Sequence, residues 1–266
     1  TPLYSSAASD VYKRQAQMSQ GAGMTFRNNI EWLAGNYNEA RMGSSIFSYL
    51  MGYEDPRLNV YFLPMDGNAS YGVEAFNGKT YQAVPAGHAN AQNDIYKSCS
   101  KPNIQSGTPT YWLRASEVYF LRAEAALVWE GFGSADSWYK QGIDMSFQEN
   151  GVTEPVDDYM NSNLSPRAYV LSHYQYGQTL SAPCETTVKF EGTTEQKLEK
   201  IMIQKWIALF PNGQEAWTEW RRTGYPKLNV IKTLKGAVQG ATLEGGIRRM
   251  IYPTSFSQTN EGKAIY

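Results

Sequence analysis

Tyrosines and amide side chains gather in one stretch of the chain, residues 59–110, and their chemistry suits an uncharged polar ligand. Neutral sugars offer hydroxyl groups and flat apolar faces, so a sugar site needs aromatic rings for stacking and a few amide or carboxylate partners. The candidate rings are Tyr71, Tyr81 and Tyr96. The accompanying amides are Asn68, Asn77, Gln82, Asn90, Gln92 and Asn93. We expect these tyrosines to contact carbohydrate; the alternative is that they anchor the segment to the protein body.

Paired carboxylates raise the possibility of glycoside hydrolysis, which needs two acidic side chains at a defined distance across the scissile bond. Asp157 with Asp158, or Glu191 with Glu195, are nominal candidates. Nothing in their surroundings distinguishes them from ordinary surface acids. The chain also has no GxSxG motif of a serine hydrolase. We therefore expect a protein that binds its ligand without catalysis, and a glycoside hydrolase is the alternative.

The sequence contains few residues or motifs that would indicate a metal or cofactor site. His88 and His173 are the only histidines, and neither belongs to an HExxH motif. Cys99 and Cys184 are the only cysteines and form no CxxC pair, so we expect two unpaired thiols in preference to a bridge. Residues 73–80 resemble a phosphate-binding loop at Gly-Lys-Thr, but valine replaces its first glycine. We expect no metal and no cofactor.

Overall composition limits the partners. The 266 residues include 24 basic and 25 acidic side chains, a net charge of −1, which excludes the basic surface typical of a nucleic-acid binder. Aromatic residues reach 14 %, with 19 tyrosines, while charged residues are only 18 %. Such a balance suits a surface that meets uncharged polar ligands or another protein. No apolar run approaches the roughly 18 residues that would span a bilayer.

Two helix-turn-helix units would position these residues. The first is predicted over 112–130 and 134–149, with Ser134 as N-cap of its second helix. We predict the buried face of the first helix to be Val118, Leu121, Ala125 and Val128. We predict the buried face of the second helix to be Ala135, Trp138, Tyr139, Gly142, Ile143 and Phe147. Two helices of this length with small residues at their crossing are typical of a tetratricopeptide-type array.

The second unit begins with a capping box formed by Thr193 and Gln196, continues to about residue 209, and resumes as a helix over 214–222. Another helix is predicted over 41–51, and short helices are possible at 157–159 and 166–174. Residues 59–110 show no sustained periodicity of apolar residues, and we predict a long irregular segment there, which we call the excursion. Residues 247–252 are predicted to be extended. Trp206, Trp217 and Trp220 lie at helical spacings and are expected in the core. The predicted fold is all-α, with helix-turn-helix pairs and long irregular loops.

Four segments carry a resemblance to a known family. Residues 117–125, EVYFLRAEA, resemble the hallmark helix of the SusD/RagB family, the nutrient-binding outer-membrane lipoproteins. The most specific block is 204–226, QKWIALFPNGQEAWTEWRRTGYP, because helical periodicity alone does not require its tryptophans and Gly-Tyr-Pro ending. DPRL at 55–58 and RRMIYPTS at 248–255 are similar to two further family signatures, in the right order. The resemblance covers most of the chain from about residue 39 to residue 252.

The resemblance implies a SusD-like fold of tetratricopeptide-like pairs with an irregular lobe that carries the ligand site. It also implies attachment to the outer membrane through a lipidated N-terminal cysteine, and delivery of a nutrient, in the first place an oligosaccharide, to a SusC-like TonB-dependent transporter. Relatives that take up peptides leave the ligand class open. A protein-interaction scaffold without glycan affinity is the remaining alternative.

The ends of the chain depart from the family pattern. Residues 1–15 resemble a translated adapter string, so we expect a non-native leader there and one SusD-like domain over 16–266. The signal peptide and the lipid-bearing cysteine are absent, and Cys99 lies too far inside the chain to serve. We therefore expect this sequence to be the C-terminal portion of a longer protein.

Overall fold

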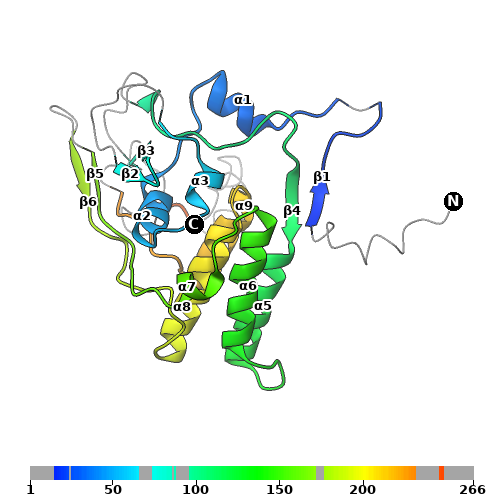
Figure 1. Cartoon of the computed structure of the whole chain (residues 1–266), viewed down its shortest axis with the longest axis vertical. Helices are drawn as coiled ribbons and strands as arrows, with labels where there is room; N and C mark the ends of the chain where they lie inside the picture. Colours follow the sequence, from blue (N-terminus) through cyan, green and yellow to red (C-terminus); the bar gives the residue numbers. More distant parts are fainter. Residues whose placement is uncertain are drawn as a thin grey trace, which may run out of the picture.

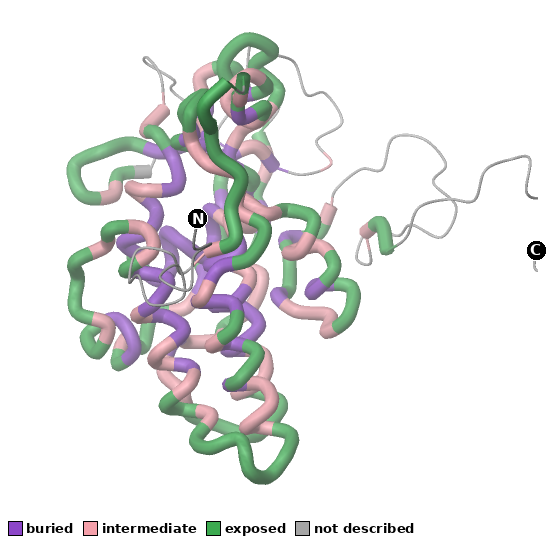
Figure 2. Tube along the Cα trace, turned by 90° about the vertical axis from the view of Figure 1, so that its right-hand side faces the viewer, coloured by how far each residue is buried: buried purple, intermediate pink, exposed green. Residues whose placement is uncertain are grey.

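The computed structural model describes residues 15–23, 25–65, 74–85, 87, 96–171, 177–231 and 246–248. It is rich in helices, with few and short strands, as predicted (Figure 1). Buried residues gather in the middle of the molecule, whereas the tip formed by the α5–α6 turn is exposed (Figure 2). The described helices are all too short or too polar to cross a bilayer.

The first predicted helical pair is confirmed as α5 (Ala115–Val128) and α6 (Ala135–Glu149), which lie side by side as an antiparallel hairpin. Ser134 caps α6, because its side chain accepts a hydrogen bond from the backbone of Ser137. The two helices lie close together at Gly142, where a Cβ atom would lie 2.7 Å from Phe120 Cε1. A glycine at this position therefore sets the spacing between the helices.

The predicted buried face of α5 is wrong. Its buried residues are Ser116, Glu117, Phe120 and Ala123. The predicted residues Val118, Leu121 and Val128 are exposed, and Ala125 is only partly buried. A helix of this composition has two stripes at helical spacing, and the positions of α6 and α8, rather than the sequence of α5, determine which stripe is covered.

The start of this unit also differs from the prediction. Thr110–Arg114 is a strand, β4, instead of the first turn of a helix. It pairs antiparallel with β1 (Gln15–Met18), so that Gln15 lies opposite Arg114. This pairing joins segments almost 100 residues apart, and helical periodicity in 112–130 carries no sign of it. Residues 1–14 lie outside the described residues, so the expected leader stays a prediction.

The second helical pair is confirmed as α8 (Thr194–Ala208) and α9 (Gly213–Thr223). The capping box is present, because Thr193 accepts from the backbone of Gln196 and the Gln196 side chain accepts from the backbone of Thr193. Asn212 caps the start of α9, and Gly224 ends it in a left-handed conformation at φ 76°. Glycine adopts that conformation without the steric cost of a Cβ atom.

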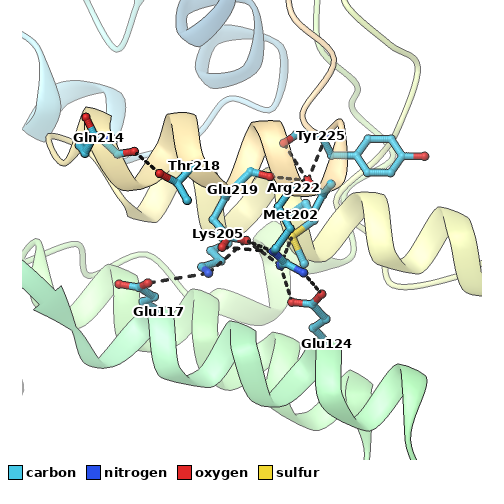
Figure 3. Close-up of polar contacts among 10 residues, drawn as sticks. Glu117, Glu124, Met202, Lys205, Gln214, Thr218, Glu219, Arg222 and Tyr225 are labelled. Atoms are coloured by element: carbon cyan, nitrogen blue, oxygen red, sulfur yellow. Dashed lines mark hydrogen bonds and ion pairs between the residues drawn. The ribbon is translucent and has the colours of Figure 1, made fainter. Parts of the chain in front are cut away.

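Charged side chains join α5 to α8 and α9 (Figure 3). Lys205 of α8, which is buried, lies 3.8 Å from Glu117 and 3.3 Å from Glu219. Arg222 of α9 binds both carboxylate oxygens of Glu124, at 2.6 and 2.8 Å, and also binds Glu219. Burial raises the pKa of Glu117. The acidic residues of α5 therefore hold neighbouring helices together, and their partners come from outside their own helix.

A second buried ion pair connects three other elements to α8. Between α2 (Ser44–Gly52) and α3 (Leu58–Tyr61), Arg57 binds Asp55 through two hydrogen bonds of 2.9 and 2.6 Å, and both side chains are fully buried. Arg57 also donates to Ser146 of α6 and Gln204 of α8. Tyr159 of α7 (Val156–Met160) donates to Asp55. The DPRL segment thus has a structural role at the centre of the molecule.

Two short hairpins complete the described fold. In β2 (Glu74–Phe76) and β3 (Lys79–Tyr81), the turn passes through Asn77 and Gly78 with positive φ at both residues. The other hairpin pairs β5 (Tyr169–Leu171) with β6 (Gln178–Leu180). The helix predicted over 166–174 is therefore wrong in its described part, whereas the short helix at 157–159 is confirmed as α7. Cys99 and Cys184 are both free thiols.

Gly52, at the end of α2, lies directly against the segment that leads into β5. A Cβ atom there would overlap the backbone of Ser165 and Pro166. The same contact is fixed by a backbone hydrogen bond of 3.0 Å from Arg167 to Ser48. Only glycine allows the two backbones to approach this closely.

Candidate binding site

The structure places two of the three predicted tyrosines in the core. The ring of Tyr81 is fully buried, and its hydroxyl donates a 2.6 Å hydrogen bond to Asn59 Oδ1. Burial raises the pKa of this hydroxyl. Tyr96 is also buried among core residues, and Tyr71 lies outside the described residues. In this structure Tyr81 and Tyr96 fasten the excursion to the helices, and their contact with a carbohydrate stays a prediction.

The excursion in turn fixes a short helix, α1 (Asn29–Gly35), that carries the partly buried Trp32 and leads to the exposed Tyr37. At its N-terminus, Asn28 donates from its backbone to Ser106 O at 2.8 Å and from its side chain to Thr108 O at 3.0 Å. The Asn28 side chain also accepts from the backbone of Ile30 and so caps the helix. One residue therefore both starts α1 and ties it to the excursion.

Arg41 holds the other end of α1. Its guanidinium donates to Ala34 O at 3.0 Å, at the end of the helix, and to Asn38 Oδ1 at 2.9 Å in the following loop. It also donates to the backbone oxygens of Tyr96 and Lys97 in the excursion, at 3.2 and 2.9 Å. The planar guanidinium satisfies several carbonyl groups in fixed directions, which makes arginine suitable for joining loops.

Trp32 and Tyr37, between these two anchors, form an aromatic pair. Their ring centroids are 4.4 Å apart and the rings are nearly perpendicular, at 87°. Tyr37 is 51 % exposed. Asn36 and Asn38, both exposed, flank Tyr37, and Asn38 has a left-handed backbone conformation at φ 56°. We call Trp32, Asn36, Tyr37 and Asn38 the aromatic platform.

The platform has the chemistry that sequence reasoning assigned to the excursion. An exposed tyrosine offers a ring for the apolar face of a sugar, and neighbouring amides offer donors and acceptors for its hydroxyls. Arg27 and Glu31 form an ion pair of 2.8 Å at α1, and the guanidinium of Arg41 binds Asn38 of the platform at 2.9 Å. Sequence analysis missed these residues; the available signal was Asn-Tyr-Asn directly after a short helix.

A large cavity of about 620 Å³ offers a second location, but its chemistry is different. Trp206, Trp217 and Trp220 contribute to its predominantly apolar lining. Of its polar side chains, Arg41 binds backbone oxygens and Asn229 donates to Ser181 O at 3.0 Å, whereas the buried Oδ1 of Asn229 has no hydrogen-bond partner among the described residues. The cavity therefore suits an apolar guest better than a sugar. Of the tryptophans expected in the core, Trp220 is buried and the other two are partly buried.

The nominal catalytic acids lie apart from the platform. Asp157, beside Asp158 in α7, pairs with Lys140, and Glu191 pairs with Lys189. Glu195 accepts a 2.6 Å hydrogen bond from the hydroxyl of Tyr225, which raises the pKa of that hydroxyl to about 12. Within the described part of the chain, no group of three or more His, Cys, Asp or Glu is arranged to hold a metal ion.

A family model named SusD-like and described as "Susd and RagB outer membrane lipoprotein" matches residues 7–264. No curated protein matches the chain significantly.

Among solved structures, a SusD homologue from Bacteroides thetaiotaomicron is 33 % identical, with a TM-score of 0.77 over 94 % of this chain and 50 % of its own. One from Bacteroides ovatus is 32 % identical, with a TM-score of 0.80 over 94 % and 51 %. A chitin-binding SusD homologue from Flavobacterium johnsoniae is 32 % identical, with a TM-score of 0.78 over 96 % and 51 %. The chain spans about half the length of these relatives.

Proposed function

This chain belongs to the SusD-like family of outer membrane lipoproteins, and from that membership we propose its function. We propose that the protein binds nutrients, in the first place oligosaccharides, at the outer membrane without cleaving them. It then passes them to a SusC-like TonB-dependent transporter. A lipid anchor outside this sequence would hold it to the membrane.

The aromatic platform is the observation that carries the proposal. Its residues 36–38 are exposed, and it is fixed at both ends to the excursion by Asn28 and Arg41. Ring stacking is effective only when the ring is already held in place, because ordering a loose side chain on binding costs free energy. Aromatic rings, amides and rigid anchors together fit an uncharged polyhydroxylated ligand.

The first ligand to test is a chitin oligosaccharide, because the homologue from Flavobacterium johnsoniae is a chitin-binding protein. Calorimetry should show that Tyr37→Ala weakens binding about tenfold, equivalent to about 1.4 kcal/mol, because a stacking surface is lost. Phe132→Ala is the matched control, since Phe132 is an aromatic residue with the same exposed fraction, 51 %, at the remote α5–α6 turn. If chitin oligosaccharides do not bind, a glycan array identifies the ligand for the same comparison.

Three results would contradict the proposal. Equal affinities of the wild type and Tyr37→Ala would exclude the platform as the binding site. A chain that binds no glycan on the array, yet captures a large outer-membrane barrel transporter in a pull-down, would favour the scaffold function instead. Release of reducing sugar from a bound polysaccharide would overturn the proposed lack of catalysis.

The three tyrosines of the excursion stay part of the proposal. Tyr71→Ala tests a contact directly, whereas Tyr81→Ala would also remove buried packing. Tyr81→Phe is the better variant, because it keeps the ring and removes only the hydrogen bond to Asn59. A loss of glycan affinity with unchanged thermal stability would assign that residue to the ligand.

A further inference from the structure

The cavity of about 620 Å³ beside α9 has no part in the proposed function. Its described lining comes mainly from α9, from the turn that precedes it, from the start of α2 and from segments around residues 229 and 247. Five aromatic residues belong to this lining: Phe62, Trp206, Phe210, Trp217 and Trp220. Sites for small organic molecules have a similar apolar character and volumes of about 300–1,000 Å³. The cavity therefore has the size and the surface of a small-molecule site.

Neighbouring groups hold the aromatic rings of the cavity in place. The indole nitrogen of Trp217 donates to Ile247 O at 3.0 Å, and the Arg221 guanidinium lies 4.4 Å from a ring centroid of Trp217. Phe210 stacks on Tyr61, with ring centroids 4.6 Å apart and 29° between the planes. Rings that are already fixed lose little conformational freedom when a ligand binds. They favour a flat aromatic ligand, which can meet them in stacked or edge-on contact.

One buried hydrogen-bond acceptor belongs to a residue of the lining and is unused. Asn229 is 6 % exposed. Its backbone N–H donates to Ser45 Oγ and its side-chain nitrogen to Ser181 O, each at 3.0 Å, whereas Oδ1 has no partner among the described residues. Turning the amide over would place Oδ1 against the oxygen of Ser181, so Oδ1 remains the free atom. A buried acceptor without a partner costs free energy, and a ligand with one donor would remove that cost.

We propose that this cavity binds a small, flat aromatic molecule whose single N–H or O–H group donates a hydrogen bond to Asn229 Oδ1. The aromatic walls favour the flat ring, and the unused acceptor favours the donor. A charged molecule would lose its hydration against a mainly apolar wall, so the ligand is uncharged. The four platform residues are not among those that line the cavity, so the proposal goes beyond glycan binding and does not depend on it.

The test compares two ligands of nearly equal shape by calorimetry. 2-Naphthol and quinoline each have two fused six-membered rings and are uncharged at neutral pH, but only 2-naphthol carries an O–H donor. We expect 2-naphthol to bind about tenfold more tightly than quinoline, because only its donor satisfies the buried acceptor. In Asn229→Ala this preference should disappear. Asn163→Ala is the matched control, since Asn163 is an exposed asparagine outside the lining, and it should keep the preference.

A second variant keeps the test decisive if Asn229→Ala does not fold. Ala216 lines the cavity from α9, and Ala216→Leu adds bulk to the cavity with a residue that favours helix, so it should abolish binding of both compounds. Unchanged binding by folded Ala216→Leu would overturn the proposal. So would a failure of 2-naphthol to bind, equal affinities of the two compounds, or a preference that survives in Asn229→Ala.

The length of the relatives supplies one further test. The same titration is made on a chimera in which the unmatched half of the Bacteroides ovatus homologue precedes this chain. We expect the folded chimera to bind 2-naphthol as the chain alone does. Loss of binding in the chimera would overturn the proposal, because polypeptide would then occupy the cavity. Glycan affinity is measured on the same samples, so a failure of the proposed function and a failure of this site are seen separately.

Discussion

Replacement of Asp55 by asparagine tests how strongly one buried charge holds the fold together. The change keeps the shape of the side chain but removes the negative charge opposite Arg57. Both side chains are fully buried, so no water can replace the lost partner. The guanidinium would be left as a buried cation whose remaining acceptors, on Ser146, Tyr159 and Gln204, are neutral.

The expected cost follows from that geometry. Breaking a buried ion pair by removing one partner destabilises a protein by about 3–5 kcal/mol, because the remaining charge is uncompensated. The neutral acceptors around Arg57 reduce this penalty, so we expect about 3 kcal/mol, at the lower end of the range. Urea unfolding followed by tryptophan fluorescence would measure it as a lower transition midpoint with an unchanged slope.

Asp157→Asn is the matched control. Asp157 also pairs with a basic residue, Lys140, but these two side chains are 65 and 45 % exposed. Exposed pairs contribute less than about 1 kcal/mol, because water screens the charges. If Asp55→Asn and Asp157→Asn lowered the free energy of unfolding equally, the reasoning would be refuted, since burial would then make no difference to the pair.

Two further predictions concern packing and pH. Gly52→Ala should lower the urea midpoint, because its Cβ atom would overlap a facing backbone, whereas Gly107→Ala, with open space around it, should not; equal midpoints would contradict this. Burial acts to raise the pKa of Glu219, but the hydrogen bond from Arg222 and the charge of Lys205 outweigh it and lower the pKa. Glu219 therefore stabilises the fold above its unfolded pKa of about 4.3, and this contribution is lost as the pH falls through the lower folded value. Glu219→Gln should reduce the free energy of unfolding at pH 7 and have progressively less effect below pH 4; a deficit that does not change with pH would be contrary evidence.

The ends of several helices could be predicted from the sequence because their signals are local. Ser134, Thr193 and Gln196 form hydrogen bonds to backbone groups three residues away. Gly224 adopts the left-handed conformation that ends α9. Such interactions need no knowledge of the rest of the fold. The family signature at 204–226 was equally accessible, since its residues are consecutive.

The candidate site was predicted only in kind. Tyrosines and amides suggested the chemistry of a sugar ligand, which stays a prediction, and burial of Tyr81 and Tyr96 depends on which helices the excursion covers. The contact of Trp32 with Tyr37 depends on the loop after α1, which Arg41 ties to residues more than 50 positions away.

The sequence by itself determined where the main helical pairs lie and to which family the chain belongs, because periodicity, caps and consecutive motifs are short-range properties. Tertiary structure alone decided which stripe of α5 is buried, that residues 110–114 pair with 15–18, and that Glu117 and Glu124 bind Lys205 and Arg222. Each of these features depends on elements that meet only in the folded chain. The free energy of contacts between such distant elements cannot be read from the spacing of residues along the sequence.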